Sequence, residues 1–222
     1  MIHKRNFFLL CWFLLCLAYA GNIKAAPAPV AEHVIKSGFP MEADMLAEMT
    51  QSLFKEYKAN DNPLSLVFYA YGTLRQADYF LKTNDFIRAS EFGKTGFFYL
   101  DEAVDLYAEN PLVRYMRARV DAYLPAAIGR CVVTLNDTEQ MLKTPGIFNA
   151  GLVEHINEMR YRALLSCKRK KQADALLAEI ELRNASTASS LASGNAPEWD
   201  INEVTEVLLP LVKGGDAANL LI

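Results

Sequence analysis

The strongest candidates for binding chemistry form an arginine- and tyrosine-rich segment near the middle of the chain. Arg114 and Arg117 follow the Glu109-Asn110-Pro111 corner and are interleaved with Tyr115 and Tyr123. Arginine and tyrosine are favoured at recognition hot spots, so we expect this segment to bind a protein or peptide partner. The alternative is a solvated helix face whose arginines pair with acids of the preceding helix. Those acids are Asp101, Glu102 and Asp105.

The histidines do not form a catalytic or metal-binding pattern. Beyond the first few residues the chain contains only His33 and His155. Glu154 and Glu158 flank His155, but a zincin motif requires a second histidine four residues away. The sequence also contains no Gly-x-Ser-x-Gly elbow, phosphate loop or dinucleotide fingerprint. We therefore predict a non-enzymatic protein with no catalytic residues, cofactor or metal.

The N-terminus resembles a secretory signal peptide. Lys4 and Arg5 precede an uncharged apolar stretch at residues 7–18, and Ala18-Tyr19-Ala20 matches the small-x-small cleavage pattern. We expect residues 1–20 to be this signal, with delivery to a bacterial periplasm or secretion. A stable membrane anchor is not expected, because a spanning helix needs about 20 apolar residues.

Charge disfavours a nucleic-acid partner. Removal of Lys4 and Arg5 leaves 21 of the 23 basic residues against 26 acidic ones, a formal charge of −5. A mildly acidic chain has no basic stripe with which to displace counterions from phosphates.

Cys131 and Cys167 are the cysteines that remain after residues 1–20. An even number of cysteines in an exported protein favours a disulfide, and two buried free thiols are the alternative. A bridge between them would close a loop of about 36 residues and stabilise the fold by roughly 3 to 4 kcal/mol in the chain-entropy model.

A series of helices must position these residues. Residues 21–38 are rich in proline and alanine near their start and predict a flexible leader. Apolar residues at helical spacing then predict an all-α domain of antiparallel hairpins at residues 39–183. The expected helices are residues 41–57, 64–81, 86–107, 112–124, 126–142, 152–168 and 172–182. Residues 184–199, rich in alanine and serine, predict a linker.

A C-terminal capping helix and tail are expected at residues 200–222. The helix covers residues 201–212, with Pro210 kinking its last turn. Its apolar face must dock somewhere, either over the exposed end of the helical stack or on another protein.

Two features concern helix packing. The helix at residues 64–81 is aromatic on more than one side, which is typical of a helix packed between neighbours. Gly93 and Gly96 lie on the inner stripe of the next helix, where each costs about 1 kcal/mol of helix propensity relative to alanine. They indicate either close approach of another backbone or a local kink.

Residues 66–97 resemble a tetratricopeptide repeat. Ala77 stands at the small position of the first helix, Phe80 at the aromatic position, and Ala89 twelve residues after Ala77. Gly93 and Gly96 depart from the family pattern, and its terminal proline comes only at Pro111. The resemblance implies a short α-solenoid of stacked hairpins. An irregular helical bundle with the same number of helices is the alternative.

These features together favour an exported protein whose helices bind a protein or peptide partner. The alternative is a small-ligand carrier or transport accessory subunit, with an apolar cavity among Phe80, Phe97 and Tyr107.

Overall fold

The chain folds into α-helices joined by short turns. The computed structural model describes residues 28–144, 146–183 and 198–214. The helices are α2 (Pro29–Ser37), α3 (Ala43–Asn60), α4 (Pro63–Lys82), α5 (Phe86–Leu106), α6 (Pro111–Asp121), α7 (Cys131–Leu142), α8 (Ala150–Ser166), α9 (Lys170–Arg183), α11 (Ile201–Glu203) and α12 (Leu209–Val212), with a 3₁₀ turn η1 (Ala126–Ile128) and a π turn η2 (Val204–Leu208). No strand occurs in these residues, so the predicted all-α fold is confirmed.

The helix boundaries follow from local capping chemistry. Asn62, Asp85, Asn110 and Asn149 each accept a hydrogen bond from a first-turn backbone N–H of the helix that follows. Such side chains satisfy amides that have no partner within the helix. Proline at the first position of α4 and α6 has no N–H to leave unpaired.

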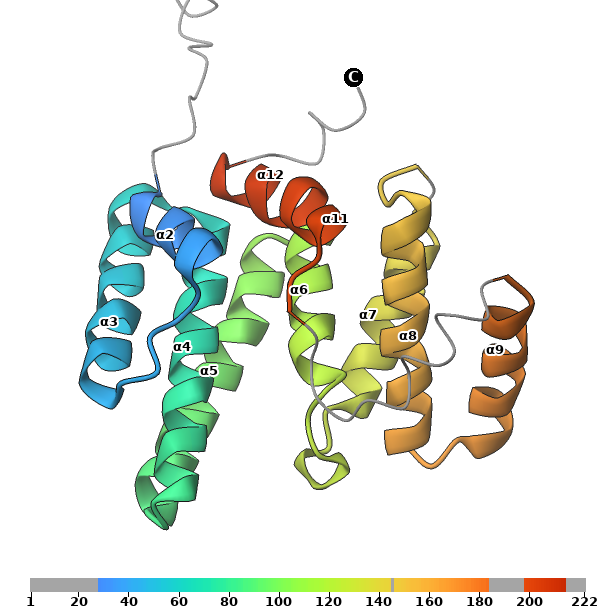
Figure 1. The fold of residues 1–222 in the computed structure, drawn as a ribbon, viewed down its shortest axis with the longest axis horizontal. Helices are drawn as coiled ribbons and strands as arrows, with labels where there is room; N and C mark the ends of the chain where they lie inside the picture. The colour runs from blue at the N-terminus through green and yellow to red at the C-terminus, as the bar shows by residue number, and fades with distance from the viewer. Residues whose placement is uncertain (1–27, 145, 184–197, 215–222) are drawn as a thin grey trace, which may run out of the picture.

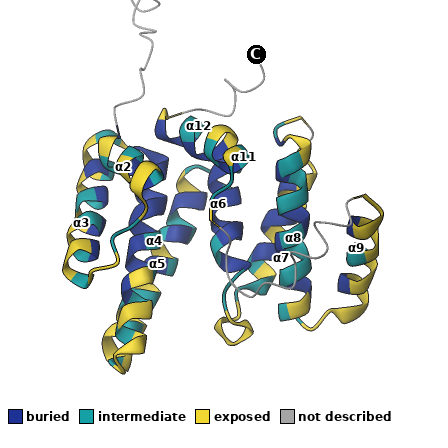
Figure 2. Cartoon of the chain, in the orientation of Figure 1, coloured by how far each residue is buried: buried dark blue, intermediate teal, exposed yellow. Residues whose placement is uncertain are grey.

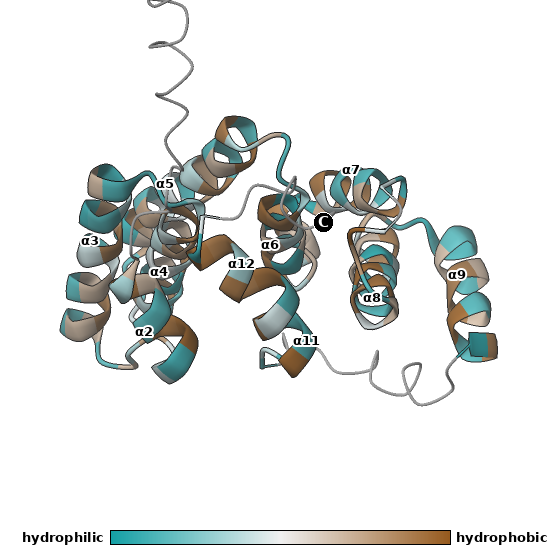
Figure 3. Ribbon diagram, turned by 90° about the horizontal axis from the view of Figure 1, so that it is seen from above, coloured by the Kyte–Doolittle hydropathy of each residue, from teal (hydrophilic) through white to brown (hydrophobic). Residues whose placement is uncertain are grey.

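Consecutive helices from α3 to α9 pack against one another and follow a row in chain order (Figure 1). The view from above shows the same order, with α5 beside α4 and α7 beside α8 (Figure 3). The short connections reverse the chain direction, as expected for helical hairpins.

The main hydrophobic core surrounds the first half of α4. Residues 62–70 are all buried there, whereas the far end of the α4–α5 hairpin is largely exposed (Figure 2). The expectation that this helix packs between neighbours is therefore confirmed for its first half, whereas most side chains of its last turn are exposed. A smaller core joins α7, α8 and α9 through Leu135, Ala163, Leu164 and Ala173.

Glycine allows close helix approach at one of the two predicted positions. A Cβ atom at Gly96 would lie 2.7 Å from Leu74 Cγ and 3.2 Å from the backbone oxygen of Ala70, both on α4. At Gly93 a Cβ atom would meet nothing within 4 Å. Close approach thus explains Gly96 and not Gly93.

The expected flexible leader is wrong for residues 29–37, which form α2. Ala31 and Val34 are buried in the main core. Ala28 provides no side-chain cap, and Glu56 of α3 instead accepts hydrogen bonds from Val30 N and Ala31 N, at 2.7 and 3.0 Å. This carboxylate supplies the negative charge favoured at a helix N-terminus. Residues 1–27, with the predicted signal peptide, lie outside the described residues.

The C-terminal helix docks over the middle of the row, so the expectation that it covers the exposed end is wrong. Its residues contact α4 and α8, and it lies across α6 (Figures 1 and 3). Asn62 Nδ2 donates to the backbone oxygen of Val212 at 2.9 Å.

Within the C-terminal helix, Leu209 N donates to the backbone oxygen of Val204, five residues earlier. This π turn ends two residues before Pro210, which has no N–H to donate to the helical hydrogen bonds. Residues 184–197 of the predicted linker and 215–222 of the tail lie outside the described residues.

Alanine substitutions at the two glycines should have opposite effects. Gly93→Ala should raise the free energy of unfolding by up to about 1 kcal/mol, through helix propensity alone. Gly96→Ala should lower it by about 1 to 3 kcal/mol, because Leu74 and the backbone of α4 must shift. Urea unfolding of both variants measures the difference. Equal effects would show that α4 and α5 do not approach closely at Gly96.

Candidate functional site

The arginines expected to bind a partner are turned into the protein. Arg114 Nη1 donates to Asp137 Oδ1 at 3.0 Å, and Arg117 Nε donates to Asp137 Oδ2 at 2.8 Å. Asp137, on α7, is fully buried. Arg117 Nη1 also donates to Asp101 of α5 at 3.1 Å, the acid that the alternative interpretation named.

A third arginine extends this cluster. Arg130, just before α7, donates to both carboxylate oxygens of Asp101, at 2.7 and 2.8 Å, and to Asp121 at 3.0 Å. We call Arg114, Arg117, Arg130, Asp101, Asp121 and Asp137 the arginine network. Its three positive and three negative charges balance, and it joins α5, α6 and α7.

The carboxyl groups of the arginine network differ in their pKa values. Burial raises the pKa of Asp121 to about 6, more than the hydrogen bond and charge of Arg130 lower it. Burial also acts to raise the pKa of Asp101, but Arg130 and Arg117 outweigh it and hold that pKa below its ordinary value. Asp101 is the more exposed of the two, so its desolvation penalty is smaller.

The tyrosines of the expected partner site also make internal contacts. Tyr115 is fully buried, and its hydroxyl donates to Glu203 Oε1 at 2.8 Å. Burial and the nearby charge of Glu203 raise the pKa of Tyr115, so the phenol keeps its proton. Tyr123 packs against the guanidinium of Arg162, whose Cζ lies 4.5 Å from the ring centroid. We therefore do not place a partner surface on Arg114, Arg117, Tyr115 or Tyr123.

A second buried ion pair holds the C-terminal segment. Arg119 Nε donates to Glu203 Oε1 at 2.6 Å, and the guanidinium Cζ lies 3.6 Å from the Trp199 ring centroid. The ring of Tyr71, on α4, is nearly parallel to the Trp199 ring, with the two ring centroids 6.4 Å apart. Asp200 and Glu203 also form a capping box at the start of α11.

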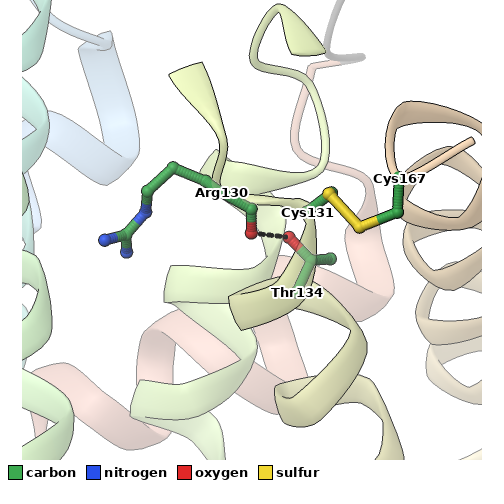
Figure 4. The surroundings of a disulfide bond; sticks show 4 residues. All are labelled: Arg130, Cys131, Thr134 and Cys167. Atoms are coloured by element: carbon green, nitrogen blue, oxygen red, sulfur yellow. Dashed lines mark hydrogen bonds between the residues drawn. A yellow bond between two sulfur atoms is a disulfide. The ribbon is translucent and has the colours of Figure 1, made fainter. Parts of the chain in front are cut away.

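Cys131 and Cys167 form a disulfide in the structure, with their Cα atoms 5.6 Å apart. It joins the first residue of α7 to the end of α8 (Figure 4). The side chain of Arg130 points away from the disulfide (Figure 4), and it pairs with Asp101 and Asp121. Arg130 and Cys131 thus hold the start of α7 on two sides, through the arginine network and through the disulfide to the end of α8.

Within residues 28–144, 146–183 and 198–214, no group of three or more histidine, cysteine, aspartate or glutamate residues could hold a metal ion. His155 Nε2 lies 2.8 Å from Asp200 Oδ2, so this histidine pairs with the C-terminal segment. No helix there has the length and apolar character needed to cross a membrane.

The strongest candidate for an interaction surface is the projecting end of the α4–α5 hairpin. Helices α4 and α5 contain 20 and 21 residues, whereas α6 contains 11. At 1.5 Å per residue, α4 and α5 each extend roughly 14 Å beyond the length of α6. Their far ends project below the other helices (Figure 1).

This projecting end exposes large apolar side chains. We define the tip surface as Tyr79, Leu81, Phe86 and Ile87, which are 42, 54, 63 and 76% exposed. Behind it, Phe80 packs on Phe92, with ring centroids 5.1 Å apart. Exposed large apolar residues that gather at one end of a hairpin are candidates for an interaction site.

A groove of about 440 Å³ runs beside the tip surface, between the start of α3 and the end of α4. Leu46, Tyr79 and Phe80 provide apolar walls, and the charged groups at the groove are Asp44, Asp85 and Arg88. Asp85 and Arg88 form an ion pair with each other. Asp44 is exposed, and its carboxylate makes no hydrogen bond or ion pair with the described residues. The groove can therefore accept both an apolar and a basic group.

The structure does not bring Phe80, Phe97 and Tyr107 together around a cavity. Phe80 lines the groove, Phe97 lies under the guanidinium of Arg130, and the Tyr107 hydroxyl donates to Asp61 at 2.9 Å. Ten residues of helix separate Phe97 from Tyr107, a rise of about 15 Å. The position of these three residues gives no support to a shared ligand cavity.

Comparison with known proteins gives no relative. The chain matches no protein-family model, no curated protein and no solved structure.

Sequence patterns could have indicated some of the missed residues. Phe86 and Ile87 are consecutive apolar residues directly after the cap at Asp85, and consecutive helical positions cannot both face one neighbour. Asp137 lies three residues after Thr134 and four before Met141, on the inner stripe of α7. A carboxylate at such a position signals a buried cationic partner.

Asp137→Asn should lower the free energy of unfolding by about 3 to 5 kcal/mol, because Arg114 and Arg117 would lose the carboxylate that pairs with them. Glu139→Gln, on the exposed face of the same helix, should change it by less than about 0.5 kcal/mol. Urea unfolding measures both. A small effect of Asp137→Asn would show that water or other groups solvate these arginines.

The raised pKa of Asp121 predicts a defined pH dependence. In the unfolded chain an aspartate titrates near 3.9, so the folded protein binds more protons between pH 4 and pH 6. This contribution to stability is present at low pH and is lost as pH rises through about 6. Between pH 7 and pH 5, wild type should therefore gain about 1 kcal/mol relative to Asp121→Asn.

Urea titrations of both proteins at pH 7, 6 and 5 test this expectation. The low pKa of Asp101 keeps that carboxylate ionised throughout this range. A difference that does not vary with pH would mean that Arg130 holds Asp121 ionised.

Proposed function

We propose that this chain is an exported, non-enzymatic helical-repeat protein that binds a protein or peptide partner through the tip surface and its groove. The observation that carries the proposal is the exposure of four large apolar side chains at the end of a hairpin that extends beyond its neighbours. Their exposure adds nothing to the stability of the described fold, so an interaction outside the chain accounts for them better.

Several features support a repeat architecture related to tetratricopeptide proteins. Consecutive antiparallel helices follow one another in a row, with α4 and α5 in close contact at Gly96. Ala77, Phe80 and Ala89 keep the spacing of the family. Solenoids of this kind bind partners along extended surfaces, which fits a binding role.

The chemistry of the groove favours a partner segment with one bulky apolar residue and a nearby basic residue. Leu46, Tyr79 and Phe80 would surround the apolar side chain. Asp44 would meet the basic group, and its carboxylate has no internal partner to release first. The acidic balance of the whole chain, with a formal charge of −3, favours approach by such a segment.

Export to a bacterial periplasm or the cell exterior remains part of the proposal. The charged start, apolar stretch and Ala18-Tyr19-Ala20 pattern support it. The disulfide between Cys131 and Cys167 is consistent with an oxidising compartment.

A random-peptide display library, selected on the immobilised protein, provides the test. Enriched peptides should share a bulky apolar residue near lysine or arginine. A Phe86→Ser and Ile87→Ser double variant should bind these peptides at least about tenfold more weakly, a loss of 1.4 kcal/mol or more.

The matched control is Leu182→Ser, which removes an 89% exposed apolar side chain on α9, far along the row from the tip surface. It should bind like wild type. Both proteins should unfold at the wild-type urea concentration, since the substituted residues are exposed. Peptides without this pattern, or peptides that bind the double variant equally well, would contradict the proposal.

A further inference from the structure

A second groove, between α2 and α3, brings together an unusual set of side chains. It has a volume of about 380 Å³, and its walls include His33 of α2 with Met45, Glu48 and Met49 of α3. It lies on a different side of the start of α3 from the groove beside the tip surface, because the residues of α3 that line the two grooves do not overlap.

The two methionines occupy one helical face. Met45 and Met49 are four residues apart on α3, so their thioethers are neighbours on the helix surface. Met45 is 59% exposed, in contrast to Met116, Met141 and Met159, which are buried in the core. Filling of core gaps, the usual structural role of methionine, therefore does not explain Met45.

The imidazole is held on the opposite wall by a well-fixed helix. Ala31 and Val34, on either side of His33, are buried, and Glu56 accepts hydrogen bonds from the first amides of α2. His33 is exposed, and its side chain makes no hydrogen bond or ion pair with the described residues. Its ring nitrogens are thus available to a ligand.

We propose that His33, Met45 and Met49 bind a soft monovalent metal ion, Cu(I), for which Ag(I) is a closed-shell substitute. Thioethers are soft ligands that select Cu(I), and a neutral imidazole is a common additional ligand of copper. These three ligands carry no charge, and the carboxylate of Glu48 in the same groove offsets the charge of the cation. Hard cations such as Mg²⁺ and Ca²⁺ need several oxygen ligands, which this set does not provide.

The test is titration of the protein with Ag(I), followed by native mass spectrometry and by NMR of ¹³C-labelled methionine methyl groups. One Ag(I) should bind per chain, and the methyl signals of Met45 and Met49 should shift. Signals of the buried Met116, Met141 and Met159 should stay in place and serve as internal references.

Three single variants should weaken binding: His33→Ala, Met45→Leu and Met49→Leu. Each should raise the Kd for Ag(I) at least about tenfold, since loss of even an outer partner costs a metal site that much. Leucine conserves the volume of methionine, so both methionine variants should keep the fold.

Two variants act as controls. Met41→Leu removes a neighbouring methionine whose sulfur faces Arg75 of α4, at 3.7 Å from Nη2. His155→Ala removes the histidine that pairs with Asp200. Both should bind Ag(I) like wild type.

Absence of binding, binding unchanged in the three variants, or equal loss with Met41→Leu would each overturn the proposed site. Binding of apolar peptides at this groove, with no effect of Ag(I), would also overturn it. The result is independent of partner binding at the tip surface, because the Phe86→Ser and Ile87→Ser variant should retain Ag(I) binding.

Discussion

Three arginines paired with three aspartates fix the positions of α5, α6 and α7. Asp137 is fully buried, and Arg117 is 8% exposed, so neither charge is well solvated by water. Such pairs add little net stability over a well-packed apolar core, but loss of one partner is costly. The arginine network therefore specifies which helix faces meet, while the surrounding apolar core provides most of the stabilisation. At the start of α7, Arg130 joins this network and Cys131 forms the disulfide to α8, so this corner is constrained by both neighbours.

A buried ion pair also positions the C-terminal helix, and burial of apolar side chains adds to it. Its Glu203 pairs with Arg119, while Val207, Leu208, Leu211 and Val212 enter the main core. At about 1.5 to 3 kcal/mol for each buried side chain, these four residues contribute roughly 6 to 12 kcal/mol. This gross gain is an upper bound, because ordering the segment costs conformational entropy. Apolar burial and the Glu203–Arg119 pair together hold the helix in the described fold.

The features that sequence could predict are those governed by local chemistry. Helical spacing of apolar residues and Asn-Pro corners located the helices, because caps and periodicity act within a few residues. The partners of the charged residues could not be found in this way. Glu56 accepts from Ala31, 25 residues away, and Arg119 pairs with Glu203, 84 residues away. Many acids were compatible with each arginine before the helix faces were known. Arg114 and Arg117 are therefore of a residue type that is common on recognition surfaces, but in the fold they lie between α6 and α7 and pair with Asp137.

The side chains of α6 are paired inside the protein, whereas those at the end of the α4–α5 hairpin are exposed, and this difference determines which of the two could bind a partner. The arginines and Tyr115 of α6 make hydrogen bonds inside the protein. A partner that bound them would first have to break these bonds. The exposed side chains of the tip surface are not used in such pairs, because α6 is too short to reach them, and among the described residues the start of α3 lies beside the end of α4. Contacts within the hairpin, such as Phe80 with Phe92 and Gly96 with Leu74, hold the projecting helices together without neighbours. The hairpin can thus present an ordered apolar surface to a partner without the ordering cost that a flexible loop would incur on binding.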